Sequence, residues 1–274
     1  MSESTTAASS GTGTAGSNSP IPPSRGMGPW VGFGLAALFA WAALTLDVPQ
    51  DRLLDLPERL ARLGGLMFPP DAEYGRESVL PAMLESIQMA WLGTLIGAVL
   101  SLPLGLLGAR NLFPALGVPI KALLGLIRVV PELLLAIYLV PVVGLGAFAG
   151  TLAIGLHSVG MLGKLSNDIV ESMDLSPLEA VTACGGGTLE NLRYAVMPQV
   201  LPEILALWLF RFEINLRASA VLGVVGAGGI GAVLLNNLSY RRFDKAGAVV
   251  VVIVVAVLAI DALSGALRKR LVQS

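Results

Sequence analysis

The sequence is poor in charged residues, cysteine and histidine. Asp, Glu, Lys and Arg make up only 14% of its 274 residues, whereas hydrophobic residues make up 54%. Soluble domains usually carry about 25% charged residues, so this composition indicates that lipid surrounds most of the chain. The one cysteine excludes an intrachain disulfide, and the one histidine excludes histidine-rich metal or catalytic sites. A net charge of -1 removes the electrostatic argument for a nucleic-acid partner.

Long apolar runs divide the chain into candidate membrane segments. About six runs approach the roughly 20 residues that a spanning helix needs. They lie at residues 30–46, 86–107, 116–143, 145–163, 197–225 and 246–263. Because a spanning helix satisfies all of its backbone hydrogen bonds within lipid, these runs predict an all-α polytopic membrane protein.

The N-terminal region has two parts. Residues 1–28 are mostly Ser, Thr, Gly, Ala and Pro and predict a disordered tail. The apolar run within residues 29–46 is either a cleaved signal peptide or a first membrane helix. Its length of about 17 residues favours a retained helix, since the apolar region of a signal peptide is shorter.

Two polar segments interrupt the apolar runs. Residues 47–85 are predicted to form a loop on one side of the membrane, in which four leucines indicate an amphipathic helix at the interface. These leucines are Leu53, Leu54, Leu56 and Leu60. Residues 164–195 predict two short helices, the first starting at Ser176 as N-cap and ending at Gly185. Lysine and arginine are nearly equally divided between the two sides, although the basic residues 268–270 favour a cytoplasmic C-terminus.

A glycine run follows the fifth apolar segment and has the formal pattern G-x-G-x-x-G. Its glycines are Gly226, Gly228, Gly229 and Gly231. A dinucleotide site would need this pattern to open a helix after a strand, with an acid about 20 residues on. Since Asp244 comes too early and apolar sequence surrounds the run, we interpret these glycines as a break in a membrane helix.

Ionisable residues within apolar runs are costly to insert into a membrane and call for a structural or functional reason. They are Arg128, Glu132, Arg211, Glu213 and Arg217, with His157 and Asn215 as polar companions. The spacing predicts that Glu213 pairs with Arg217, while Arg211 and Asn215 share another stripe of the helix. The set is either a group of internal ion pairs or a path for substrate. Its excess arginine suits a small oxyanion, which a guanidinium group matches in shape.

Other patterns carry less functional information. His157 and Ser158 are adjacent on a predicted helix, so their side chains diverge and cannot form a nucleophile and base pair. Gly93 with Gly97, and Gly146 with Gly150, predict close approach of helices.

The segment between the fourth and fifth apolar runs resembles the EAA loop of ABC importer permeases. Glu179, Ala180, Gly185 and Pro198 fall in register with that motif, and Val181 departs from it conservatively. The resemblance implies a type I ABC importer permease fold and a cytoplasmic coupling helix that docks on an ATP-hydrolysing subunit. Both termini are then expected in the cytoplasm and residues 47–85 in the periplasm.

Three further stretches resemble the phosphonate-uptake branch of these permeases, and the likeness extends over residues 86–271 as a core transmembrane domain. The stretches begin at Arg128, His157 and Arg211. The resemblance implies a translocation path containing Arg128, Glu132, His157, Ser158, Arg211, Glu213, Asn215, Arg217 and Ser219, with the glycine run as a gate. Ala147 stands where this branch is expected to have proline, which leaves phosphonate, phosphite and hypophosphite open as substrates.

The resemblance also implies the partners. It predicts a homodimer in the bacterial inner membrane with two ATP-binding subunits and a periplasmic substrate-binding protein, and neither a cofactor nor catalysis on this chain. An ion-coupled secondary transporter and a membrane scaffold are the alternatives. Inverted repeats would favour the former, and the scaffold requires neither the EAA spacing nor the intramembrane arginines.

Overall fold

The computed structural model describes residues 28–45 and 54–273. The chain divides into two units, residues 1–57 and 58–274, which are described separately. In the first unit, α1 (Gly28–Thr45) is an apolar helix of 18 residues. Its passage through a membrane stays a prediction, and the predicted disordered tail lies almost wholly outside the described residues.

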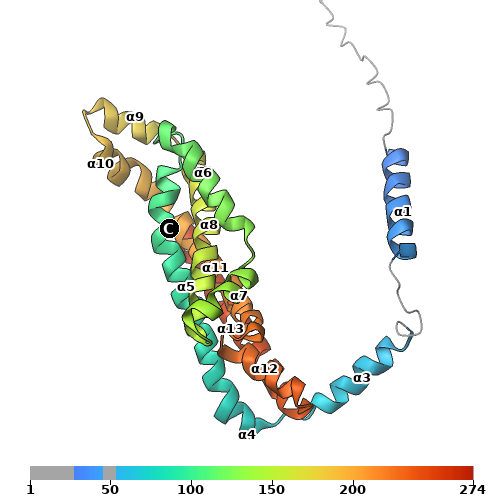
Figure 1. Ribbon diagram of the computed structural model, residues 1–274. Coiled ribbons are helices and arrows are strands. Elements are labelled where there is room, and N and C mark those ends of the chain that lie inside the picture. Colours follow the sequence, from blue (N-terminus) through green and yellow to red (C-terminus); the bar gives the residue numbers. More distant parts are fainter. Residues whose placement is uncertain (1–27, 46–53, 274) are drawn as a thin grey trace, which may run out of the picture. The chain divides into compact units, whose positions relative to one another are not determined.

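The remaining described elements are also helical (Figure 1). In chain order they are α3 (Leu56–Met67), α4 (Ala72–Tyr74), η1 (Gly75–Val79), α5 (Leu80–Leu107), α6 (Pro114–Val129), α7 (Glu132–Val143), α8 (Ala147–Ser172), α9 (Ser176–Ala183), α10 (Thr188–Glu190), η2 (Asn191–Val196), α11 (Met197–Leu222), η3 (Gly223–Val225), α12 (Gly229–Ser239) and α13 (Phe243–Gln273).

Within the described ranges, four helical stretches are long and apolar enough to cross a membrane. They are Ala72–Leu107, Ala147–Ser172, Thr188–Val225 and Phe243–Leu271. Together α6 and α7 would make a fifth span, bent by 80°. The predicted count of about six spans is therefore approximate, because the run at residues 116–143 is a broken pair and α1 is a shorter apolar helix.

Proline explains the break between α6 and α7. Val130 has extended backbone (φ -78°, ψ 117°), which is the conformation that a following proline favours. Pro131 then serves as N-cap of α7. The last turn of α6 and the first turn of α7 thus meet beside the middle of α8, where His157 contacts Val130, rather than at an end of the bundle.

Small residues let α5 and α8 pack closely. A Cβ atom on Gly97 would lie 2.4 Å from the Cβ of Ser158, so no larger residue fits without movement of α8. Gly93 is similarly placed against Ile154. The predicted close packing at Gly93 and Gly97 is confirmed. Gly146 instead has φ 128° and is the N-cap of α8, whereas Gly150 packs on Met89 and Ala227.

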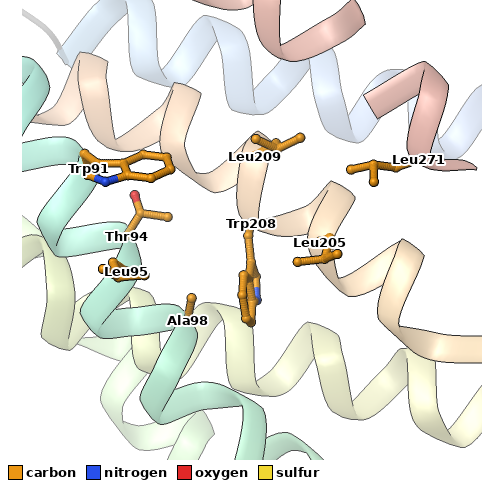
Figure 2. A pocket seen from close by; sticks show the side chains of 8 residues that line it. All are labelled: Trp91, Thr94, Leu95, Ala98, Leu205, Trp208, Leu209 and Leu271. Carbon is orange, nitrogen blue, oxygen red and sulfur yellow. The ribbon is translucent and has the colours of Figure 1, made fainter. Parts of the chain in front are cut away.

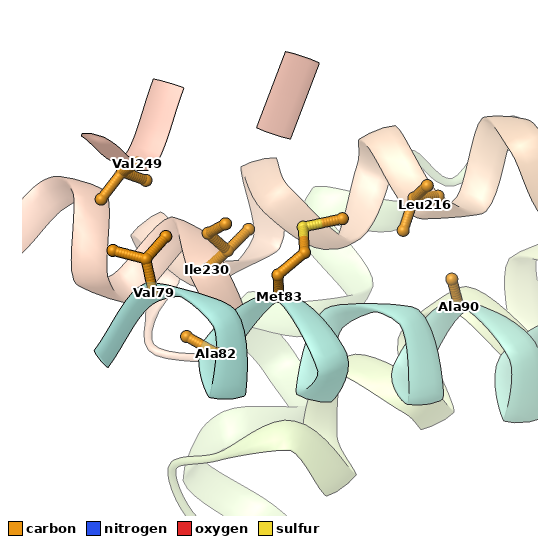
Figure 3. Packing of buried hydrophobic residues seen from close by; sticks show 7 residues of the cluster. All are labelled: Val79, Ala82, Met83, Ala90, Leu216, Ile230 and Val249. Atoms are coloured by element: carbon orange, nitrogen blue, oxygen red, sulfur yellow. The ribbon is translucent and has the colours of Figure 1, made fainter. Parts of the chain in front are cut away.

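One apolar cluster joins α5 to the C-terminal helices near α4 (Figure 3). Its buried members are Val79, Ala82, Met83, Ala90, Leu216, Ile230 and Val249. Figure 3 shows Met83 reaching from α5 toward α11, between Leu216 and Ile230. The cluster fixes α11, α12 and α13 against the same face of α5.

The start of α9 differs from the prediction. Leu175, not Ser176, is the N-cap, and Asp174 Oδ1 accepts hydrogen bonds from the backbone N–H of Ser176 at 3.0 Å and from the Ser176 hydroxyl at 2.8 Å. These two hydrogen bonds hold the pKa of Asp174 below its usual value. Ser176 is itself the first helical residue. Gly185, with φ 85°, follows the helix as predicted.

We expect Gly97→Ala to destabilise the protein, because the new methyl group overlaps α8, and overpacking typically costs about 1–3 kcal/mol. Gly125→Ala on α6 is the matched control, since a Cβ there meets nothing within 4 Å. Thermal unfolding in detergent should show a lower Tm for Gly97→Ala and an unchanged or higher Tm for the control. Equal shifts in the two variants would contradict the close packing of α5 on α8.

Candidate functional site

Five polar side chains from four helices form a hydrogen-bonded cluster, here called the polar hub. Its members are Thr94 (α5), Glu132 (α7), Ser158 (α8), Arg211 and Asn215 (α11). Asn215 Nδ2 donates to Thr94 Oγ1 at 2.8 Å and to Ser158 Oγ at 3.0 Å. Arg211 Nε donates to Ser158 Oγ at 3.2 Å, and its Nη2 lies 3.4 Å from Glu132 Oε2.

Four of the five members of the polar hub are buried, and Glu132 is partly exposed. Ser158 and Asn215 are 0% exposed, and Thr94 and Arg211 are 5% exposed. Thr94 donates its own proton to the carbonyl of Ala90 at 2.6 Å, so its oxygen serves Asn215 only as an acceptor. Burying a polar group is costly unless it forms a hydrogen bond. Here the donors of α11 find their acceptors on α5 and α8.

The polar hub lies near the middle of α5 and of α8, not toward one end of the bundle. Beyond α11, which ends at Leu222, α12 continues toward the end of the bundle where α4 lies (Figure 1). Asn237 of α12 donates to the hydroxyl of Tyr74 there at 2.9 Å.

The predicted pair of Glu213 with Arg217 is wrong. Arg217 Nη2 instead donates to both carboxylate oxygens of Asp261 on α13, at 3.0 Å each. Glu213 forms a salt bridge with Arg268, also on α13. Glu213 and Arg217 lie one turn apart on α11 and are the nearest opposite charges in the sequence. However, α13 packs along α11 and supplies a partner of opposite charge to each of them. Asp261 could have been found in the sequence by the criterion used for the others, since it is an acid within an apolar run.

Adding Asp261 and Arg268 changes the charge balance of the spanning helices. Each of the arginines Arg211, Arg217 and Arg268 has one carboxylate partner: Glu132, Asp261 and Glu213, respectively. Within the described residues, Arg128 has no such partner. Arg128 is therefore the unpaired member of this set of seven charged residues, whereas Glu85 on α5 and Glu203 on α11 are acids of the spanning stretches that likewise have no ion pair within the described residues.

The other residues predicted for the path differ in their surroundings. His157 Nδ1 lies 3.0 Å from the carbonyl oxygen of Val130, directly at the bend between α6 and α7. Ser219 is buried, but its hydroxyl donates to the carbonyl of Leu216 on its own helix at 2.7 Å. His157 thus belongs to the surroundings of the polar hub, and Ser219 does not.

The glycine run makes a tight turn between α11 and α12. Gly226, Gly228 and Gly229 have φ of 87°, 78° and 68°, a region that other residues rarely adopt. A Cβ on Gly231 would lie 1.8 Å from the carbonyl oxygen of Ala220. The predicted break in a membrane helix is confirmed, and Gly226 also accepts the N–H of Gly146 at 3.0 Å.

The segment with the EAA-like motif projects from the bundle. Glu179 and Ala180 on α9 are exposed, as is Pro198 at the start of α11. Leu178 packs against a buried cluster that includes Val170 of α8, Val196 of η2 and Val200 of α11. Beside this segment, an open hollow of about 340 Å³ contains Ala180 and Tyr194 in its lining. One face of α9 therefore packs against the bundle through Leu178, and the other face, with Glu179 and Ala180, is exposed.

An apolar cavity of about 210 Å³ lies between α5, α11 and α13 (Figure 2). Trp91 and Leu95 line it from one side, and Leu205, Trp208 and Leu209 from the other. Its lining offers almost no polar group, so it is unsuited to an anion.

Comparisons with known proteins agree with this architecture. Residues 101–274 match the family described as binding-protein-dependent transport system inner membrane component. The phosphite transport system permease protein PtxC of Stutzerimonas stutzeri is 40% identical over 240 residues, which cover 86% of each chain. The phosphate-import permease protein PhnE of Mycolicibacterium smegmatis is 43% identical over 208 residues, 75% of this chain but only 39% of that protein.

A solved structure supports the fold. A chain of the MetNI methionine ABC transporter, in inward-facing conformations, matches with a TM-score of 0.59 and 19% identity. The match covers 69% of this chain and 93% of that chain. The predicted all-α permease fold is confirmed.

We expect Thr94→Val to destabilise the protein, because it keeps the side-chain shape but removes the acceptor for Asn215 Nδ2. An unpaired buried donor costs about 1–3 kcal/mol. Ser219→Ala is the control, since that hydroxyl bonds only within its own helix. The Tm in detergent should fall clearly for Thr94→Val and less for Ser219→Ala. The reverse order would show that the polar hub does not stabilise the bundle.

Proposed function

The chain belongs to the family of binding-protein-dependent transport system inner membrane components, and from this premise we propose that it forms the translocation path for a small phosphorus oxyanion. Phosphonate and phosphite are the candidate substrates. The observation that carries the proposal is the set of seven arginines and carboxylates named above on α6, α7, α11 and α13, in which one arginine, the exposed Arg128, has no carboxylate partner among the described residues. An arginine without a carboxylate partner in a membrane path favours an anion.

The names of the similar proteins support this substrate class. PtxC is a phosphite transport permease and PhnE a phosphate-import permease, and both share at least 40% identity with this chain. Phosphite, phosphonate and phosphate are tetrahedral oxyanions, whose oxygens a guanidinium group binds in pairs. The path would include the polar hub, His157, Arg217, Glu213 and Ser219, with the turn at Gly226 to Gly231 as its gate.

ATP hydrolysis would take place on a partner. In this proposal two copies of the chain pair in the inner membrane with two ATP-binding subunits, and a periplasmic binding protein delivers the substrate. The exposed face of α9, with Glu179 and Ala180, would contact the ATP-binding subunit. Leu178 would transmit the movement of that subunit, because it packs against the buried cluster at the ends of α8 and α11.

The orientation follows from this coupling role. With α9 in the cytoplasm, both termini are cytoplasmic and residues 47–85 are periplasmic. The helix α3 would lie along the membrane surface, since Leu56, Leu60 and Leu63 on one face are all exposed and amphipathic helices bind such interfaces.

Cys184, the only cysteine, is an internal probe of this orientation. It is exposed directly after α9. A membrane-impermeant maleimide should label it in inside-out vesicles and not in intact spheroplasts. Labelling in spheroplasts would place α9 on the periplasmic side and contradict the proposed coupling.

The function is tested by purifying the chain together with its ATP-binding subunit and binding protein. Phosphite or a phosphonate should stimulate ATP hydrolysis by this complex in proteoliposomes. Transport by the chain alone, driven by an ion gradient without ATP, would instead show a secondary transporter.

The same assay tests the coupling segment. Gly185→Val should abolish substrate-stimulated hydrolysis, because a β-branched residue at φ 85° distorts the end of α9. Gly185→Asn is the matched control, since asparagine tolerates this backbone region and no atom lies within 4 Å of the added Cβ. Stimulation that survives in Gly185→Val would refute the role of this turn.

A further inference from the structure

We propose that Arg128 is the residue that binds the anion in the translocation path, whereas Arg211, Arg217 and Arg268 hold the bundle together. This inference rests on the proposed function and separates residues that sequence alone groups as one set. Arg128 lies in the last turn of α6, immediately before the bend at Val130 and Pro131.

The distribution of carboxylates distinguishes the four arginines. Glu132, Asp261 and Glu213 each engage one of the other three, so their charges are largely compensated within the chain. Arg211 is in addition buried and donates to Ser158. An incoming anion would have to compete with these carboxylates. For Arg128, no carboxylate of the described residues competes.

The backbone of Arg128 is held firmly. Gly160 of α8 allows the last turn of α6 to approach so closely that a Cβ there would lie 2.8 Å from the backbone nitrogen of Arg128. Two residues further along, the carbonyl of Val130 accepts a hydrogen bond from His157 at 3.0 Å. Glu132, on the other side of the bend, is paired with Arg211. The bend and the polar hub therefore position Arg128 together.

The side chain of Arg128 points away from this packed interior. It is exposed, and its neighbours Leu126 and Val129 are 68% and 75% exposed on the surface of the same helix. A lone guanidinium among exposed apolar groups, midway along a membrane bundle, requires a counter-ion from outside this chain. A tetrahedral phosphorus oxyanion meets this need, because two of its oxygens can accept hydrogen bonds from the guanidinium group at once.

A single fixed cation also suits transport. Binding must be strong enough for the anion to enter and weak enough for it to leave. One uncompensated arginine per chain provides attraction without enclosing the anion. The compensated arginines add rigidity to the path but little net charge.

The test is the uptake of phosphite into proteoliposomes containing the full complex, with ATP inside the vesicles and the binding protein and phosphite outside. We expect Arg128→Gln to raise the KM for transport at least about tenfold, which corresponds to about 1.4 kcal/mol of lost binding. Arg128→Lys should give an intermediate KM, because it keeps the charge and loses the paired geometry. Arg270→Gln, an identical change at an exposed position near the end of α13, should leave the KM unchanged.

The possible outcomes are distinct. Absence of ATP-dependent uptake by the wild-type complex would overturn the proposed function, and the role of Arg128 with it. Uptake by the wild type with an unchanged KM in Arg128→Gln would overturn only the role of Arg128. A lower maximal rate at unchanged KM, with basal ATP hydrolysis altered by phosphatidylglycerol in the wild type and not in the variant, would instead assign Arg128 to a lipid phosphate.

Discussion

The polar hub is the constraint on which the arrangement of the bundle depends. Ser158 and Asn215 are fully buried, so their polar atoms must find partners on neighbouring helices. Those partners come from α5, α8 and α11, and Arg211 of the same cluster pairs with Glu132 at the start of α7, so that the relative register of four helices is fixed. Apolar contacts alone are poorly directional in lipid. Hydrogen bonds between Thr94, Asn215 and Ser158 specify one register among many that small residues would permit.

Glycine and proline create the backbone shape that the hub requires. Gly97 brings α5 against α8 at the level of Ser158, and Pro131 breaks the α6–α7 span so that Glu132 reaches Arg211. Gly226 to Gly231 turn the chain at the end of α11, where α12 begins. These residues contribute no charge to the path, yet they decide which charges meet. Arg128 is exposed next to the bend as a consequence of the same geometry.

Much of this architecture could be predicted from the sequence, because apolar runs and glycine patterns are local signals. The close packing at Gly93 and Gly97 and the break at the glycine run follow from spacing alone. The pairing of charges does not. Glu213 has Arg217 one turn away, but its partner is Arg268 on a helix whose position depends on the whole bundle. Nothing in the sequence distinguishes Thr94 from its apolar neighbours. Its role as the acceptor for Asn215 becomes visible only when α5 is seen to pack against α11.

The central claim is that Glu132 and Arg211 compensate each other and thereby hold the bend between α6 and α7. A double-mutant cycle with Glu132→Gln and Arg211→Gln, read as the stability of the purified protein in detergent, tests it most directly. The account predicts that either single change destabilises the protein. It also predicts that the double variant loses less stability than the sum of the two single losses, by at least about 0.5 kcal/mol. Additive effects would contradict the account, because the two side chains would then contribute independently.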